Sequence, residues 1–184
     1  MESLSMSHDR ERWDARHARA GFDERPPNAV VMDLAAGQRQ GRALDLASGS
    51  GRHALALADR GLEVEAWDVS PVGLGLCAAR ARARGLSVVT RVVDLSEPLP
   101  LAVFDLVLMV DFLERRCWPR LPGLLAPDGL LVISTFTVDW PEPHPSRRFR
   151  LARGELRQAF PELSPLHYEE AGGRASIALK KAPA

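Results

Sequence analysis

Two short stretches of the chain combine residue types that could bind a nucleotide-like ligand. The first reads Asp45-Leu46-Ala47-Ser48-Gly49-Ser50-Gly51. Glycines at this spacing let the backbone approach a ligand closely, and the helix expected after them offers unpaired N–H groups. The second stretch ends at Asp68, where a carboxylate can accept hydrogen bonds from both hydroxyls of a ribose. Tight packing of the turn and helix capping by Asp68 are the plainer interpretations, but together the two stretches favour a ribose-containing cofactor.

Asp45 distinguishes between two such cofactors, a nicotinamide dinucleotide and S-adenosylmethionine (AdoMet). This carboxylate stands four residues before Gly49. There it would repel a pyrophosphate, whereas it suits the cationic amino and sulfonium groups of AdoMet. The chain also shows no second domain that could hold a hydride acceptor. The residues therefore favour a methyl donor, and an NAD-dependent oxidoreductase stays as the alternative.

The elements that must position these residues alternate between apolar runs and helical patterns. The patterns predict strands over 43–46, 62–67, 87–93, 104–110 and 130–135, and helices over 53–60, 71–84, 116–125 and 154–160. Two final runs, 165–170 and 174–180, flank a Gly-Gly pair and predict an antiparallel hairpin. The alternation predicts an α/β fold with a doubly wound, Rossmann-like sheet of seven strands, mostly parallel and closed by the antiparallel hairpin.

The length of 184 residues predicts a single domain, residues 1–184. Residues 41–184 would form the Rossmann-like core. Residues 1–40 would add an N-terminal lid and a helix that begins after Asn28, which has the position of an N-cap. The first 27 residues are charged and carry few apolar anchors, so we expect them to form an arm over the site.

Composition narrows the class of function. Lys plus Arg equals Asp plus Glu, at 24 each, so no overall basic field exists to hold nucleic acid or an anionic membrane. No run approaches the roughly 18 apolar residues of a membrane span, and the N-terminus lacks the apolar core of a signal peptide. The cysteines and histidines show no ligand spacing, so we assign no metal. We expect a cytoplasmic monomer or homodimer that binds neither nucleic acid nor membrane.

Ligands of such a sheet bind beyond the carboxyl ends of its strands, where the turns of this chain resemble the class I AdoMet-dependent methyltransferases. The stretch from Asp45 to Gly51 resembles their first motif, and Asp68 resembles the acidic residue after their second strand. Further similarity lies at 92–95, 104–107 and 125–131. More narrowly, residues 13–16, 27–28, 51–54 and 154–156 resemble the branch of tellurite-resistance and thiopurine-type methyltransferases. His17 departs from this branch, which often has tyrosine there.

The resemblance implies which residues bind AdoMet. Gly49 and Gly51 would pass close to the methionine part, Asp45 would orient its amino group, and Arg52 or Arg16 would pair with its carboxylate. Asp68 would hold the ribose. Asp94 would accept from the adenine amino group while the Leu95 N–H meets a ring nitrogen. The implied set is completed by Trp13 in the lid, Ala47, Val69 and Val110.

Methyl transfer from AdoMet is an in-line displacement that depends on alignment and exclusion of water, and it needs a base only when the nucleophile arrives protonated. The candidate bases are Asp111, His17 and His144. The turn after the fourth predicted strand lacks the Asn-Pro-Pro pattern of enzymes that methylate extruded bases, so we expect a small-molecule acceptor: a thiol, a heterocycle or a chalcogen oxyanion. Arginines 115, 116, 147 and 148 flank this edge. A non-catalytic AdoMet-binding module is the second alternative.

Overall fold

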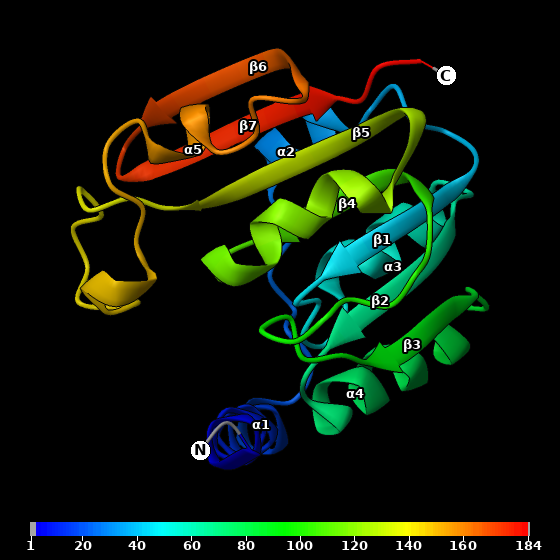
Figure 1. Ribbon diagram of the computed structural model, residues 1–184. Helices are drawn as coiled ribbons and strands as arrows, with labels where there is room; N and C mark the ends of the chain where they lie inside the picture. The colour runs from blue at the N-terminus through cyan, green and yellow to red at the C-terminus, as the bar shows by residue number, and fades with distance from the viewer. Residues whose placement is uncertain (1–2, 184) are drawn as a thin grey trace.

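Seven strands form one sheet in the order β3-β2-β1-β4-β5-β7-β6 (Figure 1). The computed structural model describes residues 3–183, so residues 1–2 and 184 of the predicted domain lie outside the described part. Five strands are parallel, and β7 runs antiparallel between β5 and β6. The predicted mostly parallel sheet with a C-terminal antiparallel hairpin is confirmed. The bounds are β1 (Arg42–Leu46), β2 (Glu63–Asp68), β3 (Val88–Val92), β4 (Phe104–Val110), β5 (Leu125–Phe136), β6 (Ser164–Ala171) and β7 (Arg174–Lys180).

Helices cover both faces of the sheet because the central strands are apolar on both sides. Along β4, Leu106 and Leu108 pack with α2 (Ala29–Leu34), α3 (Arg52–Asp59) and α4 (Pro71–Ala83). Val107 and Met109 pack on the opposite face with η1 (Arg115–Leu124) and the region of α5 (Glu155–Gln158). Within residues 3–183, no helix combines the length and apolar character needed to cross a membrane.

Two further helical segments lie beyond the carboxyl ends of the parallel strands. Figure 1 shows α1 (Ser3–Ala20) near the start of α4, and η2 (Arg147–Phe149) beyond the end of β5. Every parallel strand therefore delivers its last residues toward the edge that these two segments flank.

Two predicted caps are in place. The Ser70 hydroxyl accepts a hydrogen bond from Gly73 N at 3.0 Å, and the Asn28 side chain accepts one from Val31 N at 3.3 Å. Each satisfies a backbone donor that the first helical turn leaves unpaired. The starts of α2 and α4 were therefore predictable from local chemistry.

Two local predictions were wrong, and one helix was not predicted. Most of the N-terminal arm is a helix, α1, whose largely polar sequence gave no apolar periodicity to detect. The connection between β3 and β4, all within the described chain, contains no helix, so the strand–helix alternation is incomplete. Residues 115–124 form 3₁₀ helix, because Pro119 and Pro122 remove backbone donors that an α-helix needs. The strand β5 begins at Leu125, whereas the pattern predicted a strand from residue 130.

Candidate active site

The turn after β1 has a backbone that only small residues accommodate. Ala47, Gly49 and Gly51 all have positive φ, at 54°, 55° and 85°. The turn closes on itself through Gly51 N, which donates to Ser48 O at 2.9 Å. A Cβ on Gly51 would lie 2.2 Å from Cys77 Sγ on α4, so the absence of a side chain lets α3 and α4 approach at this point. Gly51 is therefore also required by the packing of α3 against α4.

Asp68 joins the end of β2 to this turn. Its Oδ2 accepts a hydrogen bond from Gly49 N and its Oδ1 accepts one from Ser70 N, both at 2.8 Å. Only 7% of the residue is exposed, and this burial raises the pKa of Asp68 against the opposing effect of the two N–H groups. The hydroxyl of Ser70 caps α4, so Asp68 is not the cap itself. Each carboxylate oxygen keeps a lone pair for a further donor.

Asp45 lies beneath the turn, closed off from solvent. The residue is 1% exposed, and its Oδ2 accepts a hydrogen bond from Ala54 N at 3.0 Å. Burial raises the pKa of Asp45 to about 7. The carboxyl group therefore supports the first turn of α3, and it lies behind the glycine turn.

The helix α1 is fixed to the start of α4 by one carboxylate. Asp14 accepts a hydrogen bond from the Ser70 hydroxyl and another from Val72 N at 3.2 Å. These backbone and hydroxyl donors belong to the first turn of α4, where a negative charge is favourable. Asp14 was not predicted as a site residue, and it determines where the N-terminal helix lies.

His17 packs directly against the glycine turn. A Cβ on Gly49 would lie 3.2 Å from His17 Cε1, and a Cβ on Gly73 would lie 2.9 Å from its Cδ2. Burial lowers the pKa of His17, although the nearby Asp68 carboxylate opposes this shift. His17 is therefore brought together with Gly49 and Asp68.

Other aromatic and guanidinium groups of α1 pack next to His17. Trp13 stacks on His17 with ring centroids 5.9 Å apart, and the Arg16 guanidinium lies 5.0 Å from the centre of the Trp13 ring. Arg12 reaches the other flanking segment, 6.0 Å from the ring of Phe149 in η2. Trp13, Arg16 and His17 thus form one layer over the turn, and α1 meets η2 through Arg12.

The third and fourth strands end in residues with different surroundings. Asp94 Oδ1 accepts hydrogen bonds from Ser96 N and Ser96 Oγ, at 2.8 and 2.7 Å. The Leu95 side chain is buried in the core and Val110 is 7% exposed, whereas Val69 is half-buried. The predicted residues of these turns therefore all lie at the carboxyl edge, with Asp94 as the polar group after β3.

Asp111 follows β4 and is held between two guanidinium groups. Its φ is 57°, unusual for a residue with a side chain. Arg52, the first residue of α3, donates to Asp111 Oδ2 at 3.2 Å, and Arg174, the first residue of β7, donates to Oδ1. Arg52 also donates to Pro26 O at 3.3 Å. The carboxylate of Asp111, one of the predicted bases, thus connects α3 to β7 through these two arginines.

The other predicted polar residues lie in separate surroundings. His144 is exposed, and no hydrogen bond or ion pair joins its imidazole to another residue of the described chain. Its loop is fixed by Arg150, which donates to Trp140 O at 2.7 Å and Pro145 O at 2.8 Å. Of the four flanking arginines, Arg115 and Arg116 are paired with glutamates. Within residues 3–183, no three His, Cys, Asp or Glu side chains are grouped as metal ligands.

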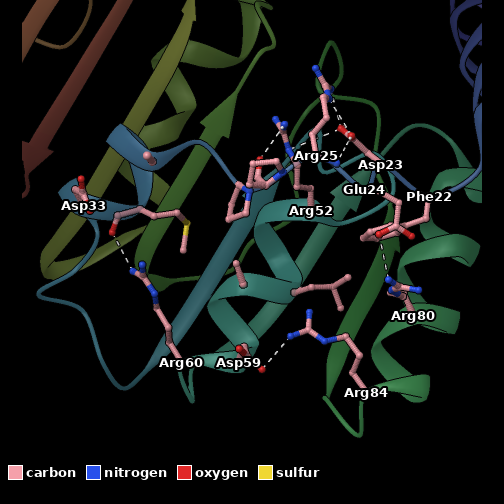
Figure 2. A pocket seen from close by; sticks show the side chains of 16 residues that line it. Phe22, Asp23, Glu24, Arg25, Asp33, Arg52, Asp59, Arg60, Arg80 and Arg84 are labelled. Carbon is pink, nitrogen blue, oxygen red and sulfur yellow. Dashed lines mark hydrogen bonds and ion pairs between the residues drawn. The ribbon is translucent and has the colours of Figure 1, made fainter.

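A cavity of about 640 Å³ lies away from the glycine turn. Figure 2 shows it between the segment that follows α1 and the helices α3 and α4, with arginine side chains projecting into it. The charges there are already matched, so we do not take it for the cofactor site. The matched pairs are Arg25–Asp23, Arg80–Glu24 and Arg84–Asp59, and Arg60 donates to Met32 O.

Comparison with known proteins agrees with this geometry. Residues 43–129, from β1 into β5, match the family model of a methyltransferase domain. This part of the chain is therefore similar to a methyltransferase domain. The chain is 37% identical over 114 residues to the demethylmenaquinone methyltransferase of Thermus thermophilus, a match that covers 58% of this chain. The chain spans about half the length of that relative, 52%.

Solved structures share the predicted fold of this chain. TehB from Haemophilus influenzae superposes with a TM-score of 0.77 at 19% identity, over 92% of this chain and 67% of its own. The N-methyltransferase NodS from Bradyrhizobium japonicum, solved in complex with S-adenosyl-L-homocysteine, gives 0.68 at 17% identity, over 83% and 84%. At these identities the likeness concerns the fold. The predicted resemblance to class I methyltransferases is confirmed.

Sequence reasoning missed the residues that connect the site to distant elements. Asp14 and Arg174 come from opposite ends of the chain, and Ser50, whose hydroxyl accepts from Asp23 N at 2.9 Å, fixes the segment after α1. One signal was available for Arg174. Because β7 is antiparallel, its first residue must lie at the edge where the parallel strands end.

Proposed function

We propose that this chain binds AdoMet at the glycine turn and transfers its methyl group to a small-molecule acceptor. The observation that carries the proposal is Asp68, a buried carboxylate bonded to Gly49 N at the ends of neighbouring strands. A carboxylate and a glycine turn in this relation supply acceptors for ribose hydroxyls and close access to the backbone. When bound, AdoMet supplies an electrophilic methyl group on a sulfonium.

The donor set of this edge fits such a ligand. Ser48 Oγ, in the glycine turn, is buried and has no hydrogen-bond partner in the described chain, so the turn holds an unused polar atom. Asp68 would hold the ribose, and Asp94 with the Leu95 N–H would hold the adenine. Gly49, with the rest of the turn, would follow the methionine part.

Ala47, Val69, Val110 and Gly51 would complete the walls around the cofactor. Asp45 would act from behind the turn, by keeping α3 in place and by its charge, since its carboxyl is closed off from solvent. Arg16, which has no ion pair within the described chain, would pair with the methionine carboxylate. Arg52 is already held by Asp111 and would position that residue.

The N-terminal helix would act as the lid of this site. Its anchor, Asp14, binds α4 beside the glycine turn, and His17 packs over the turn itself with Trp13 stacked on it. Burial lowers the pKa of His17, which favours its neutral form at neutral pH. His17 would therefore exclude water, and it is the candidate base closest to Asp68; Asp111 and His144 are the other candidates.

Titration of the protein with AdoMet, S-adenosyl-L-homocysteine (AdoHcy) and NAD tests the proposal. We expect saturable binding of AdoMet and AdoHcy and none of NAD. Saturable NAD binding without AdoMet binding would favour an oxidoreductase. A panel of thiols, heterocycles and oxyanions, assayed for AdoHcy release, then separates an enzyme from a non-catalytic AdoMet-binding module.

A further inference from the structure

A second cavity of about 350 Å³ begins at Arg174 and belongs to no function described so far. It lies between the start of α2 and the strands β5, β6 and β7. Ser134 and Ser176 form part of its wall, with their hydroxyls 2.9 Å apart, and Val30 and Ala171 add apolar surface. Its volume is in the range of small-molecule pockets.

This cavity adjoins the end of β4, at the edge of the sheet where the cofactor would lie. Ser134 is paired with Val110 across β4 and β5, and Asp111 N donates to Ser134 O at 2.9 Å. Arg174 connects the two places, since it lines the cavity and donates to Asp111. A molecule in the cavity would therefore lie beside the last residues of β4.

Arg174 keeps donors available for a ligand. Its Nη2 donates to Asp111 and to Ser134 Oγ at 3.4 Å, whereas Nε and Nη1 have no partner in the described chain. The guanidinium lies 4.5 Å from the centre of the Phe136 ring, and its side chain is 25% exposed. One face of the group is thus fixed on an aromatic ring, and part of its edge remains open to bind an anion.

The charges around the cavity select the kind of anion. Arg174 lines the cavity with Glu169 and shares Asp111 with Arg52, while Arg52 is also paired with Asp23 at 3.7 Å, so the two positive charges are already more than balanced. Glu169 is exposed and lines the same cavity. A group with two negative charges would meet repulsion from Glu169, whereas a carboxylate needs only the open edge of one guanidinium.

We infer that this cavity binds the methyl acceptor and that the acceptor carries a carboxylate, held by Arg174. The inference rests on the proposed methyl transfer. It makes Arg174 the residue that determines specificity for an anionic acceptor, while Asp111 and Arg52 hold Arg174 in place. The four arginines predicted from the sequence to flank this edge are not needed for this contact.

The test uses three carboxylates, acetate, benzoate and 3-phenylpropionate, each paired with its neutral amide. Each compound is titrated by calorimetry into the full chain saturated with AdoHcy. We expect at least one carboxylate to bind about tenfold more tightly than its amide, because a charge-assisted contact is lost in the amide. The variant Arg174→Gln should remove this preference, and Arg174→Lys should keep part of it by retaining the charge without the planar fork.

A matched control and the AdoHcy titration separate the possible outcomes. Arg153→Gln changes an exposed arginine outside the cavity, paired with Asp139, and should keep the preference for carboxylates. Thermal melting of each variant identifies loss of folding. The inference is overturned if the chain binds AdoHcy but binds carboxylates and amides with equal affinity, or binds no carboxylate. Either result leaves the proposed function standing. Carboxylate preference without AdoHcy binding supports the anion site and refutes methyl transfer.

Discussion

Replacement of Asp68 by alanine is the sharpest test of the cofactor site, because it separates support of the turn from binding. The change leaves Gly49 N and Ser70 N without their acceptor. Ser70 is fully buried, and an unpaired buried donor costs about 1–3 kcal/mol. Removing a desolvated carboxylate offsets part of this loss. We expect the free energy of unfolding without ligand to fall by about 2 kcal/mol, which lowers the Tm by about 4–8 °C at this length.

The same change should also weaken AdoHcy binding, by a free energy similar to its cost in folding. Loss of hydrogen bonds to a charged group costs about 1.5–3 kcal/mol, which corresponds to a roughly 10- to 150-fold higher Kd. Urea unfolding of the ligand-free protein measures the first effect, and calorimetric titration with AdoHcy measures the second.

Asn28→Ala serves as the control for stability alone. It removes the N-cap of α2 and should cost about 1 kcal/mol without touching the carboxylate. If Asp68→Ala binds AdoHcy within twofold of the unmodified protein while its Tm falls, Asp68 only holds the turn and the ribose assignment is refuted.

Three further predictions concern the lid, pH and the hairpin. Removal of residues 1–20 should leave the ligand-free Tm within a few degrees, since residues 9–20 add no side chain to either core cluster, but should raise the AdoHcy Kd about tenfold by titration. Burial lowers the pKa of His53 to about 4. The free energy of unfolding should therefore be highest above pH 6.5 and fall by about 3 kcal/mol toward pH 4, as the histidine takes up a proton on unfolding. Urea unfolding of His53→Gln should show a flatter dependence of this free energy on pH. Gly173→Ala should lower the Tm more than Gly172→Ala, because its Cβ would lie 2.5 Å from Trp140 Cα whereas Gly172 faces open space.

Strands, caps and the place of the glycine turn could be predicted because local sequence determines them. Runs such as Phe104–Val110 are apolar on both faces, and Ser70 and Asn28 carry the side chains that caps require. The polar sequence of α1 gave no periodic signal. Its place depends on Asp14 meeting the start of α4, a contact between positions far apart in the chain.

The surroundings of the candidate residues were harder to predict than their positions. The spacing of Asp45 before the turn predicted a carboxylate near the ligand, yet burial depends on how α3 packs above β1. Arg52 was expected to face a ligand, and its partner Asp111 became apparent only when β4 was placed beside β1. Such contacts depend on strand order, which the sequence pattern leaves open.

Because β7 runs antiparallel to β5, the tight turn between β6 and β7 determines where Arg174 lies in the proposed acceptor cavity. Because the strand enters the sheet where its neighbours leave it, the pair Gly172-Gly173 sets how far Arg174 stands from Asp111. A longer loop at this point would shift Arg174 and Glu169 apart without disturbing the glycine turn after β1. Related chains could therefore change their acceptor by altering the length of this hairpin while the cofactor side stays unchanged.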